Sequence, residues 1–329
     1  MVYQLRKALY DLKQAPRAWF NHIETYFMKE GFQRCASEQT LFTKRSSEGH
    51  IIIVSIYVDD LIFTGDCVHL LFDFKRSMMK EFDMTDMGSM SYFLGIEVLQ
   101  KEGGIFIYQK RYALEVLKKF GMQESKMVGT PIVPGSKMEK DKNGIAVDGT
   151  LFKQLVGSLF YLTSTKPDLM FITSLLSRYM ASPTELHMQA AKRALRYLKG
   201  IVDYGIYYKH GTNNKLLAFT DNDYAGDIED RKSTSGYVFM LSSAAISWSS
   251  IEKATNCNIV NYRGRVCSSC NQCLSSYMAK EDLGAARIAD IMTKPLKYDA
   301  FVKLRGMVGM CEVSKYGAQI GSQESSTKQ

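Results

Sequence analysis

The chain has 329 residues, 46% hydrophobic and 23% charged, with a formal net charge of +8 at pH 7. This composition is typical of globular proteins and excludes disordered and fibrous classes, while the excess of Lys and Arg suits a nucleic-acid partner without establishing one. No apolar run is long enough to span a membrane, the N-terminus lacks a signal-peptide pattern, and the 7 cysteines are an odd number. We therefore expect no membrane partner and an intracellular protein, cytoplasmic or nuclear, rather than a secreted one. The oligomeric state is left open.

The first part of the chain alternates between helical and strand periodicity. Pro16 interrupts the first helical pattern, so the helix is expected to begin near Ala15. The β-branched run over 51–57 is typical of a strand buried on both faces. The expected elements are helices over 15–28, 68–82 and 110–120, and strands over 40–44, 51–57, 61–63, 92–99 and 105–108.

The second part begins with a polar stretch over 123–149 that reads as a boundary or a long loop. Helices are expected over 153–163, 168–180 and 184–199, the last capped by Thr184. The period then changes to two, which predicts strands over 204–209, 216–220, 236–241 and 245–248 as successive strands of an antiparallel meander. Residues 256–278 have neither helical nor strand periodicity over a useful length, and residues 315–329 read as a disordered tail.

The sharpest local feature is the pair Asp59 and Asp60 between two apolar strands, at the expected tip of a hairpin. Two adjacent carboxylates repel each other, and a hard cation such as Mg²⁺ removes that conflict because it prefers oxygen ligands. Two such ions can activate a 3′-hydroxyl and stabilise a leaving pyrophosphate. Taken alone, the pair is equally compatible with a solvated acidic turn.

The chain also resembles the reverse transcriptase region of copia-type long-terminal-repeat retrotransposon polyproteins. The resemblance is carried, in order, by the blocks LRKALYDLKQAPRAWF, IYVDDLIFTGD, DMTDMGSMSYFLGIEV, QKRYALEVLKKFGM, VGSLFYLTSTKPDLMF, HMQAAKRALRYLKG and DNDYAGDIEDRKSTSGYVFML. It implies an RNA-directed DNA polymerase with Mg²⁺ as cofactor and an RNA/DNA primer–template as partner. Asp59 and Asp60 would be two of three catalytic, metal-binding aspartates.

The resemblance also implies roles for residues around that pair. The residues given such roles are Tyr57 near the primer end, Lys13, Gln14 and Arg17 against template and incoming nucleotide, and Phe93, Leu94 and Gly95 in a hairpin that grips the primer. From the residues alone, Lys13 and Arg17 could equally form an exposed basic helix face, and Phe93 and Leu94 could be core.

A second acidic cluster follows the strand expected over 216–220. Asp221 matches the first catalytic, metal-binding aspartate of the family's ribonuclease H domain, and acidic residues at 223, 227, 229 and 230 follow it. The alternative is an acidic loop balanced by Arg231 and Lys232.

Two further patterns have two interpretations each. Arg193, Arg196 and Lys199 form either a phosphate-facing stripe or a solvated helix face. The four cysteines at 257, 267, 270 and 273 form either a zinc site or part of an unstructured segment.

Two parts of the family pattern are missing from this sequence. The third polymerase aspartate belongs to a strand upstream of the LYDLKQAPRAWF block, and the ribonuclease H helix with its Glu is absent after Ser250. The resemblance resumes in ADIMTKPL from Ala289. We therefore interpret the family's intervening stretch as deleted, or as read in another frame over 251–288. The function expected is a catalytically deficient fragment, and the alternatives are a non-catalytic nucleic-acid-binding remnant or a non-functional gene-prediction product.

The predicted architecture is α+β. It comprises a partial reverse-transcriptase palm, a helical thumb, and an incomplete ribonuclease H-like antiparallel meander. The expected divisions are the palm with its primer-grip-like hairpin (1–122), linker and thumb (123–200), ribonuclease H-like strands (201–250), an aberrant Cys-containing segment (251–288), a ribonuclease H remnant (289–314) and a tail (315–329).

Overall fold

A computed structural model describes residues 13–211, 215–223, 226–227, 231–253 and 285–314. The described chain is built from helices and antiparallel sheets, so the fold is α+β. It divides into two compact units, Met1–Ser89 and Met90–Gln329. The four cysteines considered for zinc and the expected tail lie outside the described residues.

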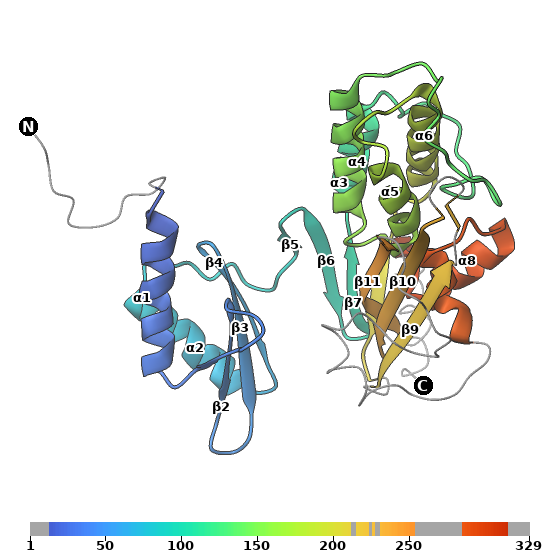
Figure 1. Ribbon diagram of the computed structural model, residues 1–329. Helices are drawn as coiled ribbons and strands as arrows, with labels where there is room; N and C mark the ends of the chain where they lie inside the picture. The colour runs from blue at the N-terminus through green and yellow to red at the C-terminus, as the bar shows by residue number, and fades with distance from the viewer. Residues whose placement is uncertain (1–12, 212–214, 224–225, 228–230, 254–284, 315–329) are drawn as a thin grey trace, which may run out of the picture. The chain divides into compact units, whose positions relative to one another are not determined.

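The first unit is a four-stranded sheet, in the order β1-β2-β3-β4, with two helices on one face (Figure 1). Helix α1 has proline in its first turn, where a missing N–H costs no hydrogen bond. Side chains from both helices meet the central strands in one apolar core that includes Phe27, Phe42 and Phe74. The elements are α1 (Ala15–Lys29), β1 (Gln33–Arg34), β2 (Leu41–Arg45), β3 (Ile51–Tyr57), β4 (Asp60–Gly65) and α2 (Val68–Glu81).

The prediction that β3 is buried on both faces is wrong. Ile52, Val54 and Ile56 are buried, whereas the residues that alternate with them are only partly covered. The two helices cover a single face of the sheet, so the β-branched run reflects strand propensity rather than two-sided burial. The hairpin of β3 and β4 is confirmed, with Tyr57 opposite Asp60.

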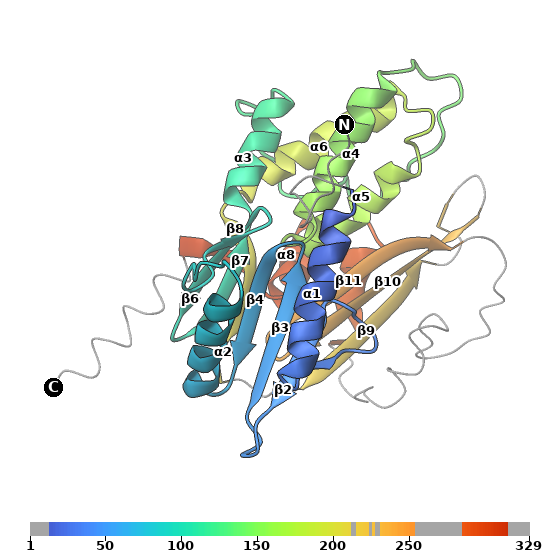
Figure 2. The same ribbon diagram turned by 90° about the vertical axis from the view of Figure 1, so that its left-hand side faces the viewer.

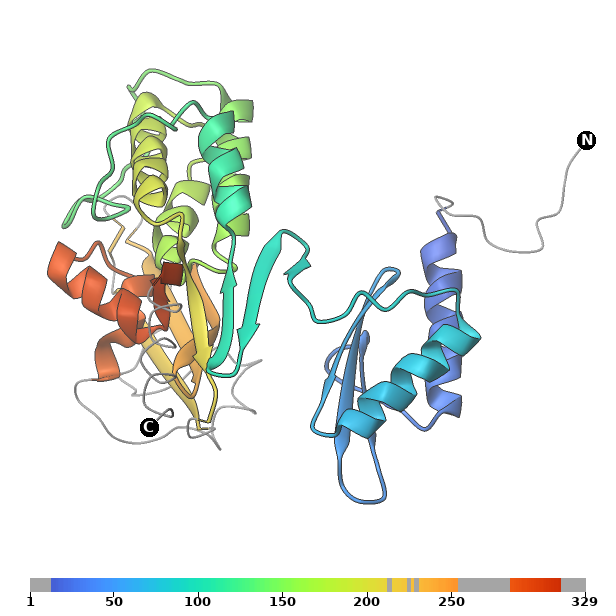
Figure 3. The same cartoon turned by 180° about the vertical axis from the view of Figure 1, so that it is seen from behind.

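The second unit contains two antiparallel sheets and most of the helices. Strands pair in the orders β12-β8-β7-β6-β5 and β11-β10-β9, and Figure 2 shows the second of these sheets. Helices α3 to α6 gather at one end of the unit (Figure 3), and a single large apolar core joins helices and sheets. The elements are β5 (Tyr92–Phe93), β6 (Ile96–Lys101), β7 (Gly104–Tyr108), α3 (Lys110–Lys119), α4 (Gly149–Leu162), η1 (Pro167–Leu169), α5 (Met170–Ser177), α6 (Glu185–Gly200), β8 (Tyr204–Lys209), β9 (Leu216–Asp223), β10 (Ser233–Leu241), β11 (Ala244–Lys253), η2 (Ala285–Met292), α8 (Tyr298–Met307) and β12 (Met310–Glu312).

Two strand predictions in this unit need correction. The expected strand over 92–99 is two strands, because Leu94 and Gly95 both have positive φ, 46° and 75°, and form a tight turn. The expected four-stranded meander has three members, β9 to β11. Strand β8 instead pairs with β7 and β12, because Ile206 on β8 is opposite Ile107 and Met310.

The long loop between α3 and α4 is fixed to the helices rather than extended into solvent. Tyr179 donates a hydrogen bond to the Met138 carbonyl at 3.0 Å. The basic residues considered for phosphate binding also hold this loop: Arg193 donates to Thr130 Oγ1 (3.1 Å), Arg196 to the Lys126 carbonyl (2.8 Å) and Lys199 to the Ser125 carbonyl (2.9 Å). Their polar groups therefore have an intramolecular role that the sequence did not indicate.

No helix in the described part of the chain is both long enough and apolar enough to cross a lipid bilayer.

Candidate active site

The acidic pair lies at the tip of the β3–β4 hairpin. Tyr57 pairs with Asp60, so the turn itself consists of two residues, Val58 and Asp59. Val58 has a φ of +54°, at a position where two-residue hairpin turns favour glycine. A β-branched residue in this region is strained by about 1–3 kcal/mol, and such strain persists only where surrounding contacts impose it.

Both carboxylates of the pair are accessible. Asp59 and Asp60 are exposed, and within the described part of the chain neither accepts a hydrogen bond or forms an ion pair. Tyr57 beside them is 49% exposed. The oxygens of the two aspartates are therefore open to a cation, a substrate hydroxyl or water.

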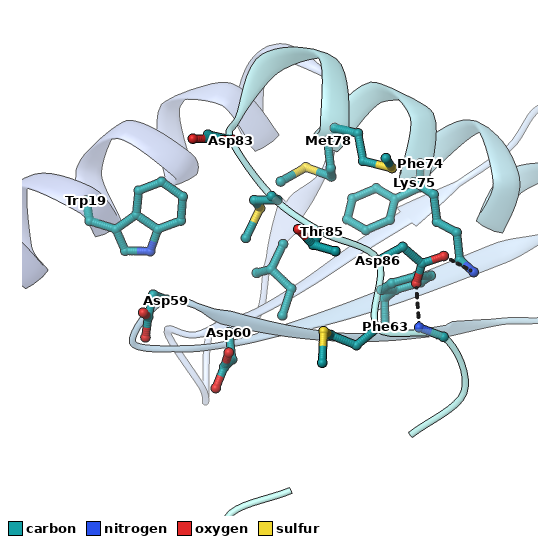
Figure 4. Close-up of a pocket in the computed structure, with 15 residues that line it drawn as sticks. Trp19, Asp59, Asp60, Phe63, Phe74, Lys75, Met78, Asp83, Thr85 and Asp86 are labelled. Atoms are coloured by element: carbon teal, nitrogen blue, oxygen red, sulfur yellow. Dashed lines mark hydrogen bonds and ion pairs between the residues drawn. The ribbon is translucent and has the colours of Figure 1, made fainter. Parts of the chain in front are cut away.

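A cavity of about 500 Å³ lies behind this tip, between the hairpin, the two helices and residues 83–88 (Figure 4). Its walls combine aromatic and methionine side chains with the carboxylates of Asp59, Asp60 and Asp83. Opposite the tip, Lys75 pairs with Asp86 at 2.9 Å. Hydrogen bonds from the Lys75 ammonium and the Gly88 N–H lower the pKa of Asp86, so this carboxylate stays ionised and engaged.

The tip has the donor chemistry of a magnesium site. Carboxylate oxygens are the ligands that Mg²⁺ prefers, and an exposed site leaves room for waters and phosphates. No cluster of three or more His, Cys, Asp or Glu arranged to hold a metal ion occurs among the described residues. The carboxylate oxygens of Asp59 and Asp60 are therefore suitable Mg²⁺ ligands, and they would supply only part of the ion's coordination shell.

The residues expected to face template and incoming nucleotide lie at the start of α1. Lys13, Gln14 and Arg17 are all exposed, and Gln14 precedes the first residue of the helix. Trp19, one helical turn further on, donates a hydrogen bond to the Val58 carbonyl at 2.7 Å. The sequence reasoning missed Trp19, whose only local signal was its place on the apolar face of the helix.

Phe93, Leu94 and Gly95 belong to the second unit, where Phe93 ends β5 and Leu94 and Gly95 form the turn to β6. The Tyr161 hydroxyl of α4 donates a hydrogen bond to the Leu94 carbonyl. A side chain at Gly95 would clash with the Tyr161 ring. The turn therefore packs against Tyr161 of α4, a contact that no sequence pattern indicated.

Asp221 lies on β9 and is already engaged. It accepts a hydrogen bond from the Thr293 hydroxyl and pairs with the Lys294 ammonium at 3.0 Å. The same ammonium lies 2.9 Å from Asp290, a neighbour that the sequence reasoning did not single out although it lies in the ADIMTKPL block. Burial raises the pKa of Asp223 close by.

Because the Lys294 ammonium already lies between the Asp221 and Asp290 carboxylates, a divalent cation does not fit there without displacing it. Of the remaining residues of this acidic cluster, Asp227 donates its backbone N–H to the Lys232 carbonyl at 3.2 Å, and Glu229 and Asp230 lie outside the described residues. A nuclease role for Asp221 remains a prediction.

Comparison with known proteins identifies relatives of the chain. Residues 1–134 match a family model described as reverse transcriptase (RNA-dependent DNA polymerase). The retrovirus-related Pol polyprotein from transposon RE1 of Arabidopsis thaliana is 40% identical over 249 residues, which is 76% of this chain and 17% of the polyprotein. The corresponding polyprotein from transposon TNT 1-94 of Nicotiana tabacum is 35% identical over 259 residues, 76% of this chain and 19% of the polyprotein.

A protein of Saccharomyces cerevisiae named for transposon Ty5-1 is 30% identical over 251 residues, which is 76% of this chain and 81% of that protein. No solved structure matches the chain significantly. The chain thus spans less than a fifth of the plant polyproteins it matches and most of the shorter yeast protein. It belongs to the reverse transcriptase family of copia-type retrotransposon Pol polyproteins.

Proposed function

We propose that the first unit is part of the palm of an RNA-directed DNA polymerase, with Asp59 and Asp60 as its metal-binding carboxylates. The observation that carries the proposal is the hairpin tip: two exposed aspartates, unengaged within the described residues, on a turn that α1 holds by a hydrogen bond. When bound there, Mg²⁺ would polarise a primer 3′-hydroxyl and stabilise the leaving pyrophosphate.

The partner we propose is a primer–template duplex. Lys13, Gln14 and Arg17 would bind phosphates of the template and of the incoming nucleotide, because they are exposed donors at the start of α1. Tyr57, half exposed beside the aspartates, would pack against the primer end.

In the second unit, we propose that the Phe93–Leu94–Gly95 turn grips the primer strand. The proposed divisions are palm and grip to residue 122, linker and thumb over 123–200, ribonuclease H-like strands over 201–250 and a remnant of that domain over 289–314. The three-stranded sheet of β9 to β11 with Asp221 supports the third division and is compatible with an incomplete nuclease domain.

We further propose that the polypeptide of residues 1–329 is a weak polymerase by itself. Two-ion phosphoryl transfer requires more carboxylates than the described residues bring to the tip. The test is primer extension on an RNA template with Mg²⁺, comparing the chain with Asp59→Asn and with Asp73→Asn. Asp73 is a matched control because it is another exposed aspartate of the same unit, and it pairs with Arg76 about one turn further along α2.

Weak extension that Asp59→Asn abolishes and Asp73→Asn leaves unchanged would support both parts of the proposal. Efficient extension would refute the proposed deficiency. Salt-dependent duplex binding without any Mg²⁺-dependent extension would favour the nucleic-acid-binding alternative. A chain with no cooperative unfolding transition would overturn all of these in favour of a gene-prediction product.

A further inference from the structure

The indole of Trp19 connects helix α1 to the acidic hairpin tip. Its Nε1–H donates to the carbonyl oxygen of Val58 at 2.7 Å, which joins α1 to the hairpin tip across 39 residues of sequence. Apart from the ladder between β3 and β4, this is the hydrogen bond that fixes the Val58–Asp59 turn within the described chain. The bond falls on the peptide group that leads directly into Asp59.

Two observations on Val58 and Asp59 indicate that this bond helps to hold the turn. Val58 is in the left-handed region at φ +54° and is 55% exposed, so its side chain is not packed into a core. Asp59, the second residue of the turn, borders the cavity behind the tip, so the turn is not closely packed on that side. A strained, poorly packed turn relaxes unless a specific contact holds it.

The indole itself is well placed to act as a fixed point. Its ring packs edge-to-face on Phe82, with centroids 5.3 Å apart, and Phe82 is only 7% exposed. Two more α1 side chains, His22 and Tyr26, pack on the same phenyl ring at 5.3 and 5.2 Å. Trp19 thus links the aromatic side chains packed around Phe82 to the backbone of the hairpin tip.

We propose that Trp19 is a positioning residue for the carboxylates of Asp59 and Asp60. By holding the Val58 carbonyl, its N–H sets the orientation of the peptide that joins Val58 to Asp59 and therefore the direction in which the two acids face. The proposal rests on the cation-binding function proposed for the tip and adds to it a residue that touches neither metal nor substrate.

The test compares two substitutions that each remove one indole N–H bonded to a carbonyl. Trp19→Phe keeps an aromatic ring against Phe82 and loses the bond to Val58. Trp248→Phe is the matched control, since Trp248 donates to the Thr163 carbonyl at 3.0 Å in the other unit. Mn²⁺ binding to the full chain is measured by the electron paramagnetic resonance signal of free Mn²⁺, and Asp59→Asn identifies the fraction bound at the tip.

We expect Trp19→Phe to weaken Mn²⁺ binding at the tip by about two- to tenfold, the range of one net hydrogen bond, and Trp248→Phe to leave it unchanged. Independently of the metal, hydrogen exchange at the amides of Asp59 and Asp60 should accelerate in Trp19→Phe alone. If both variants bind Mn²⁺ like the parent chain and exchange at the tip is unaltered, the positioning role is wrong.

The Asp59→Asn variant distinguishes a failure of the Trp19 proposal from a failure of the proposed function. If Asp59→Asn leaves Mn²⁺ binding unchanged, the tip is not a cation site and the proposed function fails. The exchange measurement then still decides whether Trp19 holds the turn. A Trp19→Phe chain that unfolds at a lower temperature but keeps parental exchange at the tip would make Trp19 a core residue only and overturn the proposal.

Discussion

The buried Lys166 gives a prediction about how stability depends on pH. Lys166 is fully buried, and its ammonium donates to the carbonyls of Ile201 and Tyr204 at 2.9 and 2.7 Å. Burial lowers its pKa from 10.5 to about 8, against the opposing charge of Asp168. Between these two pH values, the unfolded chain binds a proton that the folded chain does not, so the free energy of unfolding rises with pH.

The magnitude follows from the interval between the two pKa values. The interval from 10.5 to about 8 corresponds to about 3 kcal/mol of stability that the buried charge costs at neutral pH. Raising the pH from 7 to 9.5 should recover about 2 kcal/mol of it. Tyrosines with raised pKa values oppose this trend at higher pH, Tyr208 at about 12, but they are the same in a Lys166 variant and cancel in the difference.

The assay is urea unfolding of the parent chain and of Lys166→Gln, which keeps an amide donor without a titrating group. In a Trp19→Phe background Trp248 is the sole tryptophan, so its fluorescence follows the second unit. The difference in unfolding free energy between parent and variant should change by about 2 kcal/mol between pH 7 and pH 9.5, in favour of the parent. Parallel pH profiles would show that Lys166 titrates normally and that water reaches it.

Three further outcomes follow from the packing and charges of the two units. Gly95→Ala should cost about 1–3 kcal/mol more than Gly121→Ala in thermal unfolding, because both have positive φ but only at Gly95 would the added Cβ meet another side chain, that of Tyr161; equal losses would contradict this. Phe42→Ala should cost about 3–5 kcal/mol and Phe72→Ala less than about 0.5 kcal/mol, since Phe42 is 0% and Phe72 64% exposed. Lys294→Met should cost about 1–2 kcal/mol in urea unfolding at pH 7, because Asp221 and Asp290 lose the ammonium that they share; an unchanged free energy of unfolding would argue against the ion pairs.

The helices and hairpins of the first unit could be predicted from the sequence because their signals are local. Pro16 marks the start of α1, and the stripe of Phe74, Met78 and Phe82 marks the buried face of α2. The acidic tip between two apolar strands was equally visible, since a hairpin of this kind is encoded by adjacent residues.

Strand partners could not be predicted in the same way. The period of two in β8 is the same whichever sheet receives it, and only the contacts of Ile206 with β7 and β12 decide its place. The double-sided burial expected of β3 failed for a related reason, since β-branched residues report a strand but not how many layers cover it.

By itself, the sequence determined that this is an α+β reverse transcriptase relative with two aspartates at a hairpin tip, because residue order and local periodicity encode both. Only the tertiary structure decided what surrounds those acids. The Trp19 bond to Val58 spans 39 residues, and the Thr293 bond to Asp221 spans 72. Contacts of that range depend on how helices and sheets pack, and no short stretch of residues specifies them.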